Sequence, residues 1–214
     1  MLISRDTSSL VVDRLGDQAK GHNIAVTCFY FDFAAQKEQS ATSMLASLLK
    51  QIVSGMERIP KGILGAIQQQ KKAIGGSGLQ LADIVKMLQA ITSSQPTFIC
   101  IDGLDECERV QRLRVLDSLN QILEKAPRTR IFMTGRFHIR TEIEKRFTGQ
   151  VTTLSVGPSK ADIIIYLRAR LSGDETPNAM DQNLEANMLE RISENISDMC
   201  VGAMILRTPA QTIR

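Results

Sequence analysis

The chain has 214 residues, which is enough for one ordinary domain with a buried core and a small additional part. Its 26 basic and 23 acidic residues leave a net charge of only +3, which argues against binding to nucleic acid or to an anionic membrane surface. Aromatic residues make up 4% and tryptophan is absent, so a base-stacking surface is also not expected.

The composition also limits where the protein works. Near the amino terminus, Arg5 and Asp6 interrupt the apolar stretch that a signal peptide would need, and no window approaches the roughly 18 apolar residues of a membrane span. The four cysteines are far apart and form no C-x-x-C pair, and only two histidines could join them at a metal site. Cys28 and Cys100 lie in apolar runs, as reduced core thiols do. We therefore expect a cytoplasmic protein.

Extended and helical patterns alternate along the first part of the chain. The run Ile24–Phe33 is rich in β-branched and aromatic residues and predicts a strand. Apolar residues at helical spacing predict one helix over Met44–Met56 and another over Leu81–Ile91. Between these helices, the glycines of Gly75–Gly78 indicate a flexible connection.

The alternation continues with a buried strand over Thr97–Asp102, a helix marked by Leu113–Leu123, and a second buried strand over Thr129–Arg136. A short helix over Ile139–Phe147 and a third strand over Val151–Val156 follow. Buried strands alternating with helices predict an α/β fold in which helices cover both faces of a parallel sheet.

Beyond Gly157 and Pro158 the pattern changes to helices only. Ser159 and Asp162 form a capping box at the start of one helix, and a second helix is marked by Leu184–Ile196. The last segment, VGAMILRTPAQTIR, turns polar. We expect residues 1–156 to form the α/β domain, and residues 157–214 to form a helical annex with an irregular tail.

The strand Thr97–Asp102 leads into three carboxylates, Asp102, Asp105 and Glu106, with Gly103 allowing a sharp turn. Ligands of open α/β sheets bind at the carboxyl ends of the strands, and carboxylates this close repel one another unless a cation or another partner is present. The acids therefore indicate a site for a magnesium-bound nucleotide. The alternative is a solvated loop that caps the helix starting near Glu108.

Thr134 and Arg136 end the next strand along the chain. If the two strands are neighbours, both side chains flank the same crevice as Asp102, and Arg136 could bind a terminal phosphate through its planar guanidinium. The alternative for Arg136 is an ion pair with Asp105 or Glu106.

The segments TFICIDGLDE and RIFMTGR resemble the Walker B and sensor 1 elements of NACHT-type STAND nucleotide switches. With SSLVVDRL, VTCFYFDF and MLASLLKQI, the chain resembles fungal heterokaryon-incompatibility-type NACHT proteins, which are similar to the nephrocystin-3 amino-terminal region. The resemblance implies that Asp102 holds magnesium through water, that Asp105 and Glu106 orient the attacking water, and that Thr134 and Arg136 bind ATP or GTP. Such modules gate the oligomerisation of signalling proteins. Phe137 departs from the usual proline after the arginine.

A phosphate-binding loop needs the pattern G-x-x-x-x-G-K-[ST], and none of the 14 glycines is followed by lysine. The resemblance implies a P-loop NTPase-like sheet that lacks this loop and its first strand, which belong just before SSLVVDRL. We expect a truncated switch module that binds ATP weakly or not at all and does not hydrolyse it measurably.

The resemblance also implies that the absent strand lies between Val151–Val156 and Thr129–Thr134. Its loss would leave two unpaired edges, so we expect these strands either to collapse together or to separate. A second hypothesis is a non-enzymatic fragment that associates with full-length relatives or with itself through such edges. Neither hypothesis includes nucleic acid or a membrane.

Overall fold

The structure, a computed structural model, describes residues 2–56, 59, 65, 79–156, 159–171, 182–196 and 201–207. From residue 24 to residue 196, the longer helices and strands that the structure describes follow one another in the order that the sequence predicts. The longer elements are α1 (Leu2–Ala19), β1 (Ala25–Tyr30), α2 (Ala41–Ser54), α4 (Leu81–Ser94), β2 (Thr97–Asp102), α5 (Arg109–Lys125), β3 (Thr129–Arg136), α6 (Arg140–Arg146), β4 (Val151–Val156), α7 (Lys160–Leu171), α8 (Gln182–Ile196) and β5 (Val201–Arg207). Three 3-10 turns, Phe33–Ala35, Leu104–Glu106 and Phe137–Ile139, follow β1, β2 and β3.

The five strands that the structure describes form one sheet in the order β1-β2-β3-β5-β4. β1, β2 and β3 are parallel, with Tyr30 beside Asp102 in the register and Thr97 beside Thr129. The predicted α/β fold with a parallel sheet is therefore confirmed for these three strands. Their carboxyl ends meet at one edge of the sheet, where the predicted site residues lie.

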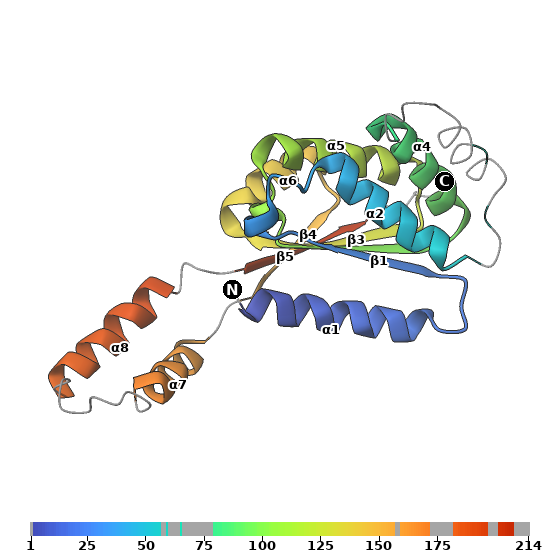
Figure 1. Ribbon diagram of the computed structural model, residues 1–214. Coiled ribbons are helices and arrows are strands. Elements are labelled where there is room, and N and C mark those ends of the chain that lie inside the picture. The colour runs from blue at the N-terminus through green and yellow to red at the C-terminus, as the bar shows by residue number, and fades with distance from the viewer. Residues whose placement is uncertain are drawn as a thin grey trace.

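Helices cover the two faces of the sheet unequally (Figure 1). Among the described helices, α2, α4, α5 and α6 lie over one face, and α1 lies across the other. The main core is on the crowded side and is formed by fully buried residues of the strands and of the helices above them. Its largest members include Phe31, Phe147, Met44, Leu45, Leu48, Ile84, Leu88, Ile91, Ile99, Ile101, Leu104 and Leu116.

Side-chain caps fix the start of several helices. Ser40 accepts a hydrogen bond from the backbone N–H of Ser43 at the start of α2. The carboxylate of Glu108 accepts the N–H groups of Val110 and Gln111 and so satisfies two free donors of α5. The predicted start of this helix near Glu108 is therefore confirmed, and the side chain of Glu108 itself is the cap.

The predicted capping box before α7 is also confirmed. The hydroxyl of Ser159 accepts from the N–H of Asp162, and the Asp162 carboxylate accepts from the N–H of Ser159. The Ser159 hydroxyl also donates to the Asp162 carboxylate, at 2.6 Å. Because this hydrogen bond, together with the one from the Ser159 N–H, favours the charged carboxylate, the pKa of Asp162 lies below its ordinary value.

The expectation of helices only beyond Gly157 is wrong for residues 201–207. This segment forms β5, which lies antiparallel between β3 and β4 and pairs with both, from Arg136 beside Val201 to Arg130 beside Arg207 on the β3 side. The edges of β3 and β4 therefore neither collapse together nor separate. The backbone N–H and C=O groups along these edges need partners, and the carboxyl-terminal segment supplies them.

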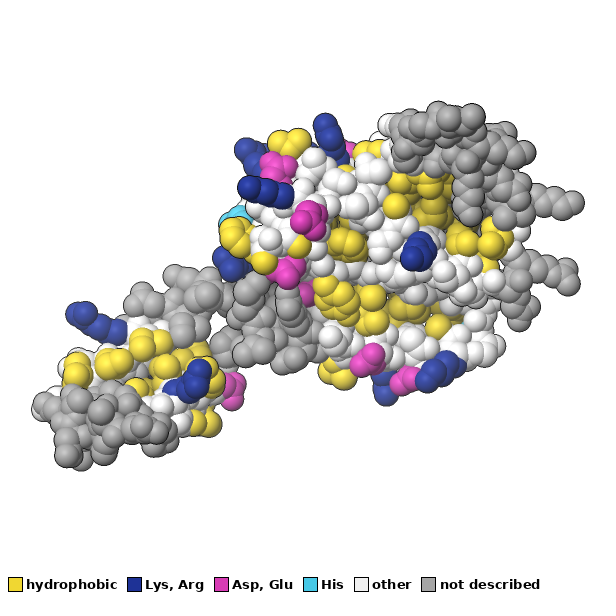
Figure 2. Space-filling view, viewed as in Figure 1, with side chains coloured by type: hydrophobic (Ala, Val, Ile, Leu, Met, Phe, Trp, Pro, Cys, Tyr) yellow, Lys and Arg dark blue, Asp and Glu magenta, His cyan; other side chains and the backbone are white. Residues whose placement is uncertain are grey.

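α7 and α8 pack against each other and project away from the sheet as a hairpin (Figure 1). Ile163 and Leu189 are buried in this hairpin, at 6% and 8% exposure. Other large apolar side chains remain exposed on it, as the space-filling view shows (Figure 2): Ile165, Tyr166 and Leu184. No helix among the described residues combines the length and the apolar character needed to cross a bilayer.

Replacing Met204 in β5 by proline should destabilise the whole sheet. Every residue of a strand that is paired on both sides donates its N–H to one neighbour, and proline removes that donor. We expect a loss of about 1–3 kcal/mol in the free energy of unfolding, measured by urea denaturation. Met204→Thr, which keeps the N–H and suits a strand, is the control. Equal stability of the two variants would show that β5 does not support the sheet.

Candidate functional site

The candidate site lies at the carboxyl ends of β1, β2 and β3. Asp102 ends β2, and the chain then turns at Gly103, whose φ of 66° is the left-handed conformation that favours glycine. A Cβ on Gly103 would also approach the carbonyl oxygen of Phe31 to 3.4 Å. This turn positions the 3-10 segment Leu104–Glu106, and with it Asp105 and Glu106, beside the end of β3.

Asp102 is buried, at 4% exposure, and its Oδ1 accepts two hydroxyl hydrogen bonds. Ser8 of α1 and Thr134 of β3 each donate to it across 2.5 Å. The hydroxyl oxygen of Thr134 in turn accepts the N–H of Gly103 at 3.1 Å. Thr134 therefore lies beside Asp102 as predicted, and it holds both the carboxylate and the turn that follows.

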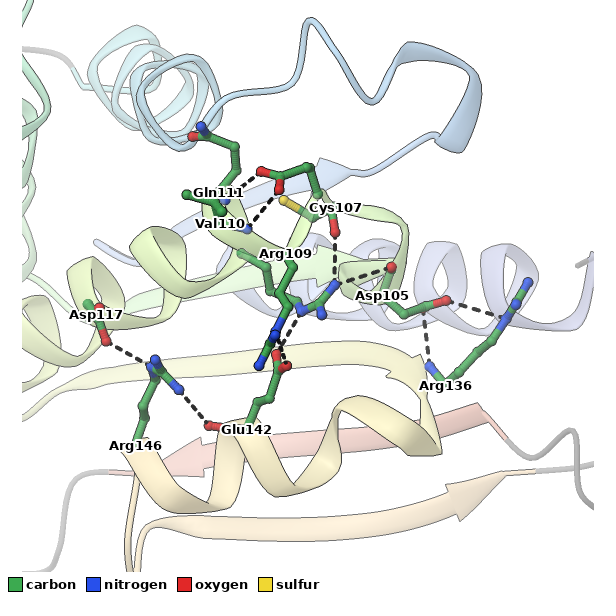
Figure 3. A network of polar contacts seen from close by, with 11 residues as sticks. Asp105, Cys107, Arg109, Val110, Gln111, Asp117, Arg136, Glu142 and Arg146 are labelled. Carbon is green, nitrogen blue, oxygen red and sulfur yellow. Dashed lines mark hydrogen bonds and ion pairs between the residues drawn. The ribbon is translucent and has the colours of Figure 1, made fainter.

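Asp105 binds Arg136 in two ways (Figure 3). Its Oδ1 accepts the backbone N–H of Arg136 at 3.1 Å, and its Oδ2 lies 3.4 Å from the Arg136 Nε. A Cβ at position 135 would lie 3.4 Å from the Asp105 Oδ1 and 2.7 Å from Cδ1 of Ile139, so glycine leaves room for this contact. Of the two alternatives for Arg136, the structure therefore contains the ion pair with Asp105.

Glu106 contacts the 3-10 turn that follows β1. Its Oε2 accepts the N–H of Phe33 at 3.0 Å, and its backbone carbonyl accepts a hydrogen bond from Gln36. The structure thus brings the three acids and Arg136 to one edge of the sheet. Asp102, Asp105 and Glu106 nevertheless each contact a different protein group.

A second polar network lies next to the Asp105 turn and was not predicted (Figure 3). Arg112 of α5 is 6% exposed and donates to the carbonyl oxygens of Asp105 and Cys107, at 3.4 and 2.8 Å. Its Nε also donates to the Glu142 carboxylate of α6 at 2.9 Å, and Arg109 pairs with the other Glu142 oxygen. Arg112 therefore ties the acidic turn to α5 and α6.

The hydrogen bond from Arg112 lowers the pKa of Glu142 below its ordinary value of 4.5, and Arg109 adds to this effect while partial burial opposes it. The carboxylate is therefore charged at neutral pH. An arginine this deeply buried needs such a charged partner, because an isolated buried charge is costly.

The cysteines that the structure describes carry no disulfide and no reactive thiol. Burial raises the pKa of Cys100 to about 12 and that of Cys107 to about 11, so both thiols are protonated at neutral pH. Cys200 lies outside the described residues, as does the glycine-rich segment 75–78. Within the described ranges, no three histidine, cysteine or acidic side chains are grouped so that they could hold a metal ion.

An apolar hollow of about 310 Å³ lies between α1 and the sheet face that α1 covers. Val11 and Leu15 line it from the helix, and Phe98, Cys100 and Phe132 line it from the strands. Almost no polar surface faces this hollow, so it offers hydrophobic contact rather than groups for catalysis.

Sequence reasoning missed Ser8, Arg112 and Glu142. Ser8 is 94 residues from Asp102 in the chain, and no local pattern connects them. Arg112 and Glu142 stand among other charged residues of α5 and α6, and only the packing of the two helices brings them together.

Thr134→Val should lower the free energy of unfolding by about 1.5–3 kcal/mol, measured by urea denaturation. Valine keeps the shape but removes the hydroxyl that donates to Asp102 and accepts from Gly103. Thr152→Val, on the exposed side of β4, is the matched control and should change stability by less than about 0.5 kcal/mol. Similar effects of the two substitutions would show that the Asp102 contacts contribute little.

Glu142→Gln should lower stability at neutral pH by about 1–3 kcal/mol, because the neutral amide of the variant cannot offer a charged partner to Arg112. The folded-state pKa of Glu142 is depressed, so its contribution is complete above the unfolded value of 4.5 and is lost as the pH falls through the folded pKa. The difference between wild type and variant, followed by urea denaturation, should shrink in acid.

Glu144→Gln provides the control for Glu142. Glu144 forms an exposed ion pair with Arg140, with side chains 41% and 39% exposed, so its loss should cost less than about 0.5 kcal/mol at any pH. A Glu142 effect that did not change between pH 7 and strong acid would contradict the charged pairing with Arg112.

The family model of the nephrocystin 3 N-terminal domain matches residues 7–136 of the chain. The matched range runs from α1 to the end of β3 and contains Asp102, Asp105, Glu106, Thr134 and Arg136. None of the curated proteins compared with the chain matches it. Because the family match covers more than half of the sequence, the protein belongs to the nephrocystin 3 N-terminal family.

Proposed function

We propose that the chain is a nucleotide-switch module of the NACHT/STAND type in which the acidic strand end holds the fold together instead of serving ATP or GTP. In this proposal the described domain binds magnesium-nucleotide weakly or not at all and does not hydrolyse it. The observation that carries the proposal is the engagement of Asp102, Asp105 and Arg136 by other groups of the same chain.

The state of Arg136 is the first support. A phosphate-binding arginine must offer its guanidinium to an anion, yet Arg136 lies against Asp105, whose carboxylate is 9% exposed. The same carboxylate also accepts the Arg136 N–H. A phosphate would have to compete with this nearby negative charge, which disfavours binding.

The state of Asp102 is the second support. A carboxylate that binds magnesium, directly or through water, must present an oxygen to the ion or its hydration shell. One oxygen of Asp102 accepts from both Ser8 and Thr134, and the residue is almost fully buried. Asp105 and Glu106 are held by other partners, so the donor set does not fit a magnesium-bound nucleotide.

The third support is the sequence itself. The 214 residues contain no G-x-x-x-x-G-K-[ST] segment, whose backbone N–H groups and lysine supply most of the affinity for a triphosphate. The acids at the end of β2 without such donors would repel a nucleotide.

A non-enzymatic interaction module is the second candidate function. The exposed apolar residues Ile165, Tyr166 and Leu184 of the α7–α8 hairpin favour it, because large apolar groups gathered on a small projecting element are typical of contact surfaces. Full-length relatives of the same family are the partners that this candidate implies.

Titration with magnesium-ATP and magnesium-GTP tests the proposed function. We expect no measurable heat in isothermal titration and no rise in thermal stability at millimolar nucleotide. A nucleotide that did bind, at a concentration a thousandfold over its Kd, would add about 4 kcal/mol to the free energy of unfolding. Arg136→Ala should leave this result unchanged. Low-micromolar affinity that Arg136→Ala weakens would overturn the proposal and establish a nucleotide site at this edge.

A further inference from the structure

β5 occupies an unusual position in the sheet. It runs antiparallel between β3 and β4 and pairs in register with both, from residue 201 to 207 on one side and from residue 201 to 206 on the other. β4 lies at the end of the sheet, so β5 is the strand that joins it to the rest. The short segment Val201–Arg207 thus completes the sheet between β3 and β4.

The path into β5 runs through the projecting hairpin. The chain leaves the sheet at the end of β4, forms α7 and α8, and returns into the neighbouring position as β5 (Figure 1). α7 and α8 pack against each other, and Ile163 of α7 and Leu189 of α8 are buried. Among the described residues beyond β4, the two β5 ladders therefore provide the main attachment to the α/β body.

An element attached in this way can be exchanged between copies at little cost. In an exchanged dimer, β5 of one copy would form the same backbone hydrogen bonds with β3 and β4 of the other, so no new complementary surface is needed. The closed form is favoured only by the effective concentration of a strand on its own chain, and this concentration falls as the connection lengthens. Here the connection extends from Val156 to Val201.

We propose that β5 is an exchangeable strand and that the position between β3 and β4 accepts β5 of a second copy of this chain. The hairpin α7–α8 then acts as the arm that carries the strand across. The occupant is a second copy because β5 is the segment whose length and register fit both neighbouring strands. This proposal is independent of nucleotide binding.

Strand exchange can be read out with cysteines placed on β4 and β5 of different copies. Leu154 and Ala203 are partners in the β4–β5 register. Paired Cα atoms of antiparallel strands lie about 4.5–5.5 Å apart, within the range that a disulfide spans. One copy carries Leu154→Cys and the other, with a tag of different mass, carries Ala203→Cys. Both also carry Cys200→Ser, which removes the native thiol next to β5.

The two copies are mixed in urea, refolded together, oxidised, and separated by non-reducing electrophoresis. We expect a disulfide-linked heterodimer whose ratio to monomer rises about tenfold for a tenfold rise in concentration while it is the minor form. The control partner carries Leu184→Cys, at an exposed position on α8, and should give only background cross-linking.

A single chain with both Leu154→Cys and Ala203→Cys completes the test. At low concentration it should form the disulfide within one chain and then remain monomeric by light scattering at every concentration. This outcome would also show that the variants fold and that the cysteine pair is competent. If the single chain forms its disulfide but the mixed copies cross-link no more than the Leu184→Cys control, β5 is not exchanged and the proposal is wrong.

Discussion

A strand inside a sheet must find hydrogen-bond partners on both of its edges, and this requirement governs how the chain is arranged. β2 meets it by pairing in parallel with β1 on one side and β3 on the other. On the far side of β3 the partner is β5, which runs in the opposite direction and in turn pairs with β4. Because backbone groups left without partners cost free energy, the position between β3 and β4 has to be filled.

Acidic side chains gather where β1, β2 and β3 have their carboxyl ends, and each of these side chains has its own partners in the fold. Asp102 is held by two hydroxyl groups, Asp105 by a guanidinium and a backbone amide, and Glu106 by a backbone amide. Arg112, which is paired with Glu142, donates to the backbone carbonyls of Asp105 and Cys107 in the acidic turn. Carboxylates that would repel one another can therefore lie close together without a shared cation.

The family match and the sheet divide the chain differently. The nephrocystin 3 N-terminal match ends at residue 136, with the last residue of β3, and so contains the acidic edge and most of the core. β4, the α7–α8 hairpin and β5 follow this range, and they complete the sheet on the other side. The part that identifies the family thus carries the candidate site, whereas the following part determines how the sheet closes and what surface the hairpin presents.

The sequence by itself determined the α/β class, the positions of β1 to β4, the helices between them and the edge where the acids gather. The spacing of apolar residues along the chain reflects which face of a helix or strand is buried, so a local stretch of sequence is enough to predict these features. Only the tertiary structure decided that residues 201–207 form a strand between β3 and β4, that Arg136 pairs with Asp105, and that Ser8 binds Asp102. The physical reason is that each of these features depends on a partner distant in sequence, which a local pattern does not encode.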